Sequence, residues 1–251
     1  MIIKSAENKI FKYALKLQDK KFRAESKLFL IEGKKQIEEI PENWNIKQIF
    51  ISERYKNTVE NFKNIITFSE RLFSKLSATK SPQGIIAAVE KKFHNVKEIT
   101  KNTGPFVILE NIQDPGNLGT IIRSADAFGL KAVFVSKGSA DIYSDKTLRA
   151  AAGSIFRLPV IDDITIENIL NLMNEEKIFV FAASLKGEKY LNDIKFADKS
   201  AFIIGNEGHG IKSETENSAA ILVKVRTLGK TRSLNAAVAA SVIMYEISKK
   251  L

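Results

Sequence analysis

Short, nearly continuous apolar runs recur through the second half of the chain. They are rich in Val, Ile and Phe, which is typical of strands covered on both faces in a parallel sheet. Between two of them, Leu118, Ile121, Ile122, Ala125 and Phe128 fall on one face of a helix. Alternating strands and helices predict an α/β fold with a mostly parallel sheet. The runs are Phe106–Leu109, Ala132–Val135, Ile178–Ala183, Ala201–Ile204 and Ile221–Val225.

The first part of the chain, residues 1–95, has a more mixed pattern. A basic helix is expected from about Ser5 to Lys20, followed by a short apolar run at Leu28–Ile31. Together with the strand-like runs further on, this predicts a small α/β domain. Those runs are Ile46–Ser52, Ile65–Phe68 and Gly84–Val89.

The stretch His94–Pro105 contains charges, Asn102, Gly104 and Pro105 but no periodic apolar positions. It is the best candidate for a linker. We therefore expect two domains, residues 1–95 and 106–251, joined by a linker at residues 96–105.

The C-terminal helix, expected from about Leu234 to Lys249, is apolar almost all round in the run Ala236–Met244. Such a helix must be buried on several sides. Its small residues permit close approach of another backbone, either inside the same subunit or at a dimer interface.

The composition is that of an ordinary soluble globular protein, with 251 residues, 44% hydrophobic and 27% charged. No apolar run is long enough to span a bilayer, and the N-terminus does not resemble a signal peptide. There is no cysteine, which excludes disulfides and thiolate metal sites. We expect a cytoplasmic protein with no membrane association and no metal site.

The formal net charge of +10 is unevenly distributed, because residues 1–35 hold ten Lys or Arg against four Asp or Glu. A basic segment attracts nucleic acid, since each cation placed on a phosphate releases condensed counterions. A solvated helix face is the alternative interpretation of the same charges.

Polar residues follow the expected strand Phe106–Leu109, where ligands of open α/β sheets bind. Pro115-Gly116 makes a turn, and Asn117 is placed to cap the helix that carries Arg123. An ordinary capped helix with a surface arginine would show the same residues.

A second polar segment, Gly205–Gly210, follows the strand Ala201–Ile204 and places Glu207 among glycines. Glycine allows a ligand to approach the backbone closely. The spacing is not that of the dinucleotide-binding fingerprint. A plain turn is the alternative.

The third segment, Ser233-Leu234-Asn235, opens the apolar C-terminal helix. Ser233 is a favoured N-cap residue. A cap does not explain Asn235, which is expected inside the first turn of a helix otherwise made of Ala and Val.

In this order, the three segments resemble the motifs of the SpoU (TrmH-like) RNA ribose methyltransferases of the SPOUT superfamily. The resemblance covers about Phe106 to Lys250 and is most specific through Asn111–Gly129. The N-terminal part is similar to the small L30e-like RNA-binding domain of the ribosomal-RNA members. The residues that carry this second similarity are Asn8, Lys21, Arg23, Glu32-Gly33 and Ser81-Pro82-Gln83-Gly84.

The resemblance implies a knotted α/β fold with a C-terminal trefoil, a homodimer, and S-adenosyl-L-methionine as the methyl donor. The donor would lie against the backbone at Gly205, Val225 and Leu234. The polar constellation around the ribose and its phosphate would be Asn117, Arg123, Glu207, Ser233 and Asn235.

Two points of chemistry stay open. Arg123 is either the base or a phosphate clamp, because a guanidinium stays protonated at neutral pH and is a poor base by itself. His209 is a conceivable alternative base.

One departure from the family pattern is Val225-Arg226-Thr227, where the family usually has Ile-Pro-Met. The lost proline removes a rigid turn.

The resulting hypothesis is methylation of a ribose 2′-hydroxyl in RNA, with 23S ribosomal RNA favoured and transfer RNA as a close alternative. A non-catalytic RNA-binding or ribosome-assembly protein on the same fold is the second class of hypothesis. A Rossmann-like dehydrogenase is the third, and the missing dinucleotide fingerprint argues against it.

Overall fold

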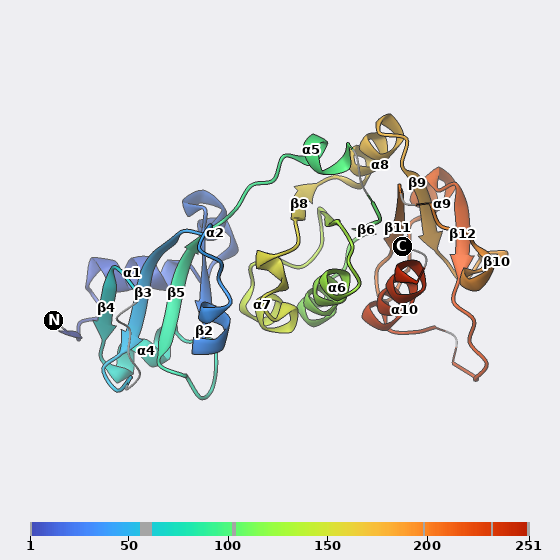
Figure 1. Ribbon diagram of the computed structural model, residues 1–251. Coiled ribbons are helices and arrows are strands. Elements are labelled where there is room, and N and C mark those ends of the chain that lie inside the picture. Colours follow the sequence, from blue (N-terminus) through green and yellow to red (C-terminus); the bar gives the residue numbers. More distant parts are fainter. Residues whose placement is uncertain (1, 56–61, 102–103, 198, 232, 250–251) are drawn as a thin grey trace. The chain divides into compact units, whose positions relative to one another are not determined.

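The computed structural model describes residues 2–55, 62–101, 104–197, 199–231 and 233–249 (Figure 1). Its contacts divide the chain into two compact units. Unit 1 comprises the described residues up to Phe93 together with Tyr143–Leu148; unit 2 comprises His94–Ile142 and the described chain from Arg149 onward. Each unit has its own sheet and its own hydrophobic core.

The elements of unit 1 form a mixed sheet covered by helices. They are β1 (Ile2–Ile3), α1 (Lys9–Lys16), α2 (Lys20–Ser26), β2 (Leu28–Glu32), α3 (Lys34–Glu38), β3 (Ile46–Ser52), β4 (Ile65–Phe68), α4 (Glu70–Leu76) and β5 (Ile85–Glu90). The strand order is β1-β4-β3-β5-β2, with β5 antiparallel to both of its neighbours. Phe11, Phe50 and Phe68 contribute to the buried core between α1, α4 and the sheet.

The basic helix predicted from about Ser5 to Lys20 is present as the shorter α1, and a second helix, α2, begins at Lys20. Asn8 caps α1 by accepting from the amide of Ile10 at 2.9 Å. Asp19 then caps α2 by accepting from the amide of Phe22 at 2.9 Å. Each of these capping residues starts a separate helix, since it satisfies amides that a continuous helix would pair internally.

Several of the unit 1 residues on which the similarity to an RNA-binding domain rests interact with other residues of unit 1. Arg23 is 7% exposed, and its Nη1 donates to the carbonyls of Leu17 (2.9 Å) and Gln18 (2.6 Å). The Glu32 carboxylate accepts from the Ser77 hydroxyl at 2.6 Å. Gly33 has φ +102°, and a Cβ there would lie 3.1 Å from Oε1 of Gln83. These residues hold unit 1 together.

Unit 2 contains an all-parallel sheet in the order β10-β12-β9-β11-β6-β7-β8. Its elements are α5 (Val96–Thr100), β6 (Phe106–Leu109), α6 (Pro115–Ala127), β7 (Ala132–Ser136), α7 (Asp145–Ala151), β8 (Val160–Ile164), α8 (Ile166–Glu175), β9 (Phe179–Ala183), β10 (Lys189–Tyr190), β11 (Ser200–Ile204), α9 (Ser213–Ser218), β12 (Ile221–Lys224) and α10 (Ala236–Ser248), with 3₁₀ turns at Ser154–Phe156 and Leu191–Asp193. The first four residues of α7, Asp145 to Leu148, are grouped with unit 1. The prediction of an α/β fold with a mostly parallel sheet is confirmed.

The central strands of unit 2 are covered on both faces. Every residue of β6, β7 and β11 is buried. Phe106 and Ile108 pack in one cluster with residues of α8, such as Ile169. Strand alternation turns Val107 and Leu109 to the other face, and α6 and α10 lie together there (Figure 1). Continuous apolar runs therefore did identify doubly covered strands.

Three features of unit 2 differ from the sequence prediction. Strands β8 and β10 were not predicted, because β8 includes Asp162 and Asp163 and β10 has only two residues. Part of the predicted linker is helical, since Val96 and Ile99 of α5 pack against the core of unit 2. Residues 102 and 103 of the predicted linker lie outside the described residues.

The trefoil knot remains a prediction of the resemblance. Within the described residues, no helix is both long and apolar enough to cross a bilayer.

Candidate active site

The three polar segments lie at one edge of the unit 2 sheet. β6 and β11 are hydrogen-bonded neighbours, and the first two segments follow them directly. The third segment lies between β12 and α10. Since the carboxyl ends of parallel strands share an edge, segments far apart in sequence meet there.

The first segment begins α6 differently from the prediction. Asp114 is the N-cap, and its Oδ1 accepts from the amide of Asn117 at 2.8 Å. Pro115 occupies the start of the helix, where its fixed φ and missing N–H cost nothing. The prediction that Asn117 is the cap is wrong. Asn117 lies inside the first turn, which leaves its side-chain amide available for other partners.

The second segment is a tight loop closed by Asn206. The backbone of Asn206 exchanges two hydrogen bonds with Gly210, each 2.9 Å long. Its side chain accepts from the amides of Gly208 (2.9 Å) and His209 (3.1 Å) and donates to the carbonyl of Asn111 (2.9 Å). The sequence analysis did not predict the structural roles of Asn111 and Asn206. Nothing in their spacing distinguishes them from ordinary turn residues.

Gly205 is required by this loop. A Cβ at Gly205 would lie 2.2 Å from the carbonyl carbon of Gly210 and 2.3 Å from the nitrogen of Ile211. The close approach expected at this glycine is therefore made by the chain's own backbone.

Glu207 joins the second segment to the first. Its carboxylate accepts from the side-chain amide of Asn117 at 3.0 Å. It also accepts from the backbone amides of Gln113 and Asp114, each at 3.3 Å. Partial desolvation of the Glu207 carboxyl raises its pKa, but the hydrogen bonds from Asn117 and the backbone amides outweigh this and hold the pKa below its ordinary value. Glu207 is therefore ionised at neutral pH.

Asn235 joins the third segment to the first. Its side-chain nitrogen donates to Oδ1 of Asn117 at 3.1 Å, and its Oδ1 caps α10 by accepting from the amide of Ala237 at 2.9 Å. The expectation that Ser233 caps this helix and Asn235 lies inside it is wrong, because Asn235 is the cap. A chain of hydrogen bonds thus runs from Glu207 through Asn117 to Asn235.

A cavity of about 340 Å³ opens beside this chain of hydrogen bonds. The three predicted donor-binding residues Gly205, Val225 and Leu234 all line it, as do Glu207 and Ser233. Further lining residues come from the loop after β9 and from α9, including Leu185, Lys186 and Glu216. Lys186 donates to Glu216 at 2.7 Å, and this hydrogen bond, with one from Ser184, holds the pKa of Glu216 below its ordinary value.

Arg123 stands apart from this network. It is exposed on α6 and does not line the cavity. Among the described residues, its side chain makes no hydrogen bond and no ion pair. The structure therefore brings together Asn117, Glu207 and Asn235, and leaves Arg123 available to an external group.

Comparison with known proteins identifies the chain. The model of the SpoU rRNA methylase family matches residues 104–245, more than half of the chain. The chain belongs to the SpoU rRNA methylase family. The model of an MRM3-like substrate-binding domain matches residues 8–87. The predicted SpoU resemblance, with its ribosomal-RNA-type N-terminal domain, is confirmed.

Relatives of this SpoU protein extend over its whole length. The 23S rRNA (guanosine(2553)-2′-O)-methyltransferase RlmP of Bacillus subtilis (strain 168) is 34% identical over 248 residues, covering 98% of each chain. The crystal structure of an AdoMet-bound rRNA methyltransferase from Sinorhizobium meliloti is 28% identical, covers 100% of this chain and 98% of its own, and has a TM-score of 0.89. A solved RNA 2′-O ribose methyltransferase is 26% identical, with 100% and 99% coverage and a TM-score of 0.85. The predicted enzyme class and its cofactor are confirmed.

The departure of this SpoU chain at Arg226 has a structural counterpart. The Arg226 guanidinium lies 4.8 Å from the ring centroid of Tyr190, and Nζ of Lys224 also lies 4.8 Å from that centroid. Cation–π contacts with a residue of β10 thus hold the strand end where the proline is missing.

Proposed function

We propose that this protein methylates a ribose 2′-hydroxyl of ribosomal RNA with S-adenosylmethionine as donor. The observation that carries the proposal is the hydrogen-bonded chain from Glu207 through Asn117 to Asn235. These hydrogen bonds connect all three polar segments beside one cavity, and the stability of an α/β core alone would not require such a network.

The cavity residues fit the donor. Ile204, Leu185 and Leu234 offer apolar surface for an adenine. Glu207 lines the cavity as a carboxylate and makes no ion pair among the described residues, which suits a cationic ligand. Bound there, S-adenosylmethionine supplies an electrophilic methyl group on a sulfonium. A dinucleotide pyrophosphate would instead meet the charge of Glu207, which argues against the dehydrogenase alternative.

Arg123 is proposed to bind an RNA phosphate next to the reacting ribose. Its planar fork suits bidentate phosphate binding, and a guanidinium, which carries its charge at neutral pH, is a poor base unless a neighbour activates it. Asn117 and Asn235 orient Glu207 and the start of α10, and Ser233 lines the cavity. Positioning of the ribose hydroxyl is then the main contribution of the chain.

Ribosomal RNA is favoured as the substrate because the RlmP relative named for 23S rRNA matches both units of the chain. We assign RNA binding to unit 1, with the domain boundary near residue 95, and catalysis to unit 2. An rRNA substrate also makes the cytoplasm the expected location. Transfer RNA remains the alternative substrate.

A homodimer completes this proposal. In α10, Val238 is 49% exposed and Tyr245 is 51% exposed, although the helix is apolar. A second copy packed on α6 and α10 would cover these side chains and bring external groups to Arg123. Sedimentation equilibrium should give twice the chain mass, and Tyr245→Glu should shift the protein toward the monomer.

The test is to incubate the full chain with methyl-labelled S-adenosylmethionine and bulk rRNA or bulk tRNA from cells that lack the protein. Label in a 2′-O-methylnucleoside from rRNA is the expected result, and label from tRNA alone would change the substrate. Arg123→Ala should lose transfer and keep donor binding by calorimetry. Lys131→Ala, an exposed cation beyond the same helix, is the control and should keep transfer. Full activity of Arg123→Ala would remove Arg123 from the mechanism.

A further inference from the structure

One face of α1 combines lysines with an exposed aromatic ring. Lys9, Lys12, Tyr13 and Lys16 are all exposed and lie within about 100° of arc around the helix. The opposite face carries Phe11 and Ala14, which are buried in the core of unit 1. The basic face is therefore not needed to fix α1 on its sheet.

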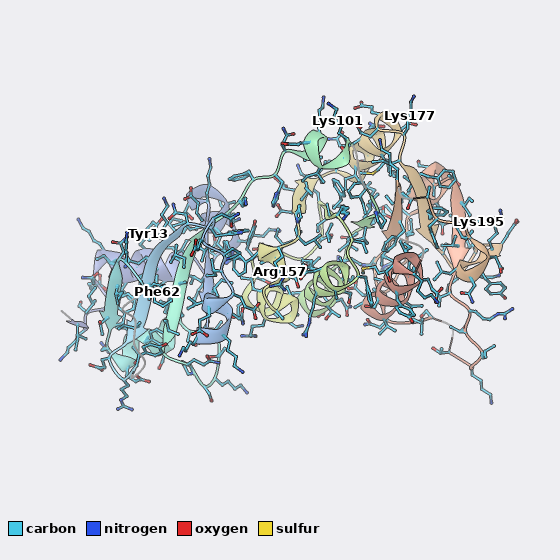
Figure 2. All side chains as sticks on the ribbon, viewed as in Figure 1. Tyr13, Phe62, Lys101, Arg157, Lys177 and Lys195 are labelled. Atoms are coloured by element: carbon cyan, nitrogen blue, oxygen red, sulfur yellow. The ribbon has the colours of Figure 1, made fainter. Side chains whose placement is uncertain are left out.

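Tyr13 is held in place by a second ring. Its ring centroid is 5.3 Å from that of Phe22, with the rings at 79°. Lys16 places Nζ 5.6 Å from the Phe22 centroid. The Asp19 cap at the start of α2 fixes the backbone of Phe22. Tyr13, labelled in Figure 2, nevertheless stays 44% exposed, so the contact with Phe22 orients the ring without covering it.

The charges around Tyr13 are mostly uncompensated. Lys12 pairs with Glu7. Within the described part of the chain, Lys9, Lys16 and Lys20 have no carboxylate within ion-pair distance. Lys9 and Lys16 lie at the two ends of α1, about 10 Å apart along its axis. The ring is thus flanked by cations on both sides along the helix.

This combination suits an unpaired nucleotide. In a duplex the base faces are already stacked, so an exposed ring adds nothing to duplex binding, whereas the lysines would bind any phosphate. An unpaired base can stack on the ring while its neighbouring phosphates lie on the lysines. The residues of unit 1 that carry the family resemblance, Arg23 and Glu32 among them, are instead engaged within the fold.

We propose that Tyr13, supported by Phe22 and flanked by Lys9 and Lys16, is a stacking site for an unpaired base of the RNA substrate. The proposal rests on the proposed function for the identity of its ligand. It adds a site on the outer face of α1, and it makes single-stranded RNA next to the target the feature that unit 1 recognises there.

The test measures binding of a fluorescein-labelled single-stranded RNA of mixed sequence, and of the same RNA as a duplex, to the full chain. Tyr13→Ala should weaken single-strand binding about 5- to 100-fold and leave duplex binding within about twofold. Tyr13→Trp should retain single-strand binding. Ile10→Ala, also exposed on α1 but without a ring, is the matched control and should change both affinities less than about twofold.

The lysines give an independent readout. Lys16→Gln should lower the slope of log affinity against log salt by about 0.7 for a single strand. Equal single-strand affinity of wild type and Tyr13→Ala, or no single-strand binding by wild type, overturns the stacking site. Unfolding midpoints of all variants identify any loss that comes from misfolding, and Tyr13→Phe keeps the ring contact if Tyr13→Ala is unstable.

Methyl transfer distinguishes this inference from the proposed function. Tyr13→Ala should raise KM for RNA and leave kcat unchanged, because Tyr13 lies outside the cavity and its network. A wild-type protein that shows Tyr13-dependent RNA binding without methyl transfer keeps the stacking site and removes the proposed function. If the wild type is active and Tyr13→Ala has an unchanged KM for RNA, the proposed function is kept and the stacking site is removed.

Discussion

Gly205→Ala is the substitution whose effect follows most directly from the geometry of the site. The new Cβ would lie 2.2 Å from the carbonyl carbon of Gly210, and ordinary carbon contacts are ~3.5 Å or longer. The facing backbone must therefore move by about 1.3 Å. It cannot move alone, because Asn206 and Gly210 are joined by two backbone hydrogen bonds of 2.9 Å.

Overpacking of this kind costs about 1–3 kcal/mol. For a chain of this size, each kcal/mol lowers the unfolding midpoint by about 2–4 °C. We expect Gly205→Ala to lower the midpoint by about 2–12 °C in differential scanning fluorimetry. We also expect at least a tenfold loss of S-adenosylmethionine affinity by calorimetry, since the moved loop forms part of the cavity wall.

Gly208→Ala in the same loop is the matched control for stability. Its Cβ would have one neighbour, Oδ1 of Asn206 at 3.6 Å, which is an ordinary contact. Its midpoint should stay within about 1 °C of wild type. If Gly205→Ala matched wild type in both midpoint and donor affinity, the reasoning from the close backbone approach would be refuted.

Three further predictions concern the network and its surroundings. Asn117→Asp replaces the donor to Glu207 by a like charge, so kcat/KM for methyl transfer should fall at least tenfold; an unchanged value would exclude Asn117 from the site. Wild type should be more stable than Glu207→Gln at neutral pH, because the lowered pKa of Glu207 stabilises the fold fully above its ordinary value of 4.5 and progressively less as the pH falls through the lowered value. That difference should disappear as the pH falls below 4.5, and urea titrations across this range would measure it; a pH-independent difference would contradict the stated cause. Arg226→Ala should lose about 0.5–1 kcal/mol of cation–π energy and increase hydrogen exchange at residues 225–229, whereas Arg226→Lys should retain part of the protection.

The sequence predicted those parts of the fold in which side chains alone determine the structure. The strands β6, β7 and β11 were identified because they are buried on both faces and therefore carry no polar residue apart from a serine at one end of β7 and of β11. β8 was missed because it carries Asp162 and Asp163, which its position in the sheet leaves exposed. The position of a strand in a sheet depends on tertiary structure, and the periodicity of apolar residues does not predict it.

The site shows the same division. The sequence placed Asn117, Glu207 and Asn235 in one constellation through the resemblance, and the structure joins them by hydrogen bonds. It did not predict which residue caps each helix, because Asp114 and Asn117, or Ser233 and Asn235, are chemically similar candidates a few positions apart. Backbone geometry decides between them, and no residue pattern reports that geometry.

The hydrogen bonds through Asn117 also restrict when the protein can act. They join residues 90 and 118 positions apart, and the second of them needs the start of α10, close to the C-terminal end of the described chain. Contacts this distant in sequence form late in folding, because the intervening chain must close first. During synthesis, unit 1 is therefore complete while the network of unit 2 still lacks Asn235. With RNA binding assigned to unit 1 as proposed above, a nascent chain would be able to bind RNA before it is able to methylate it.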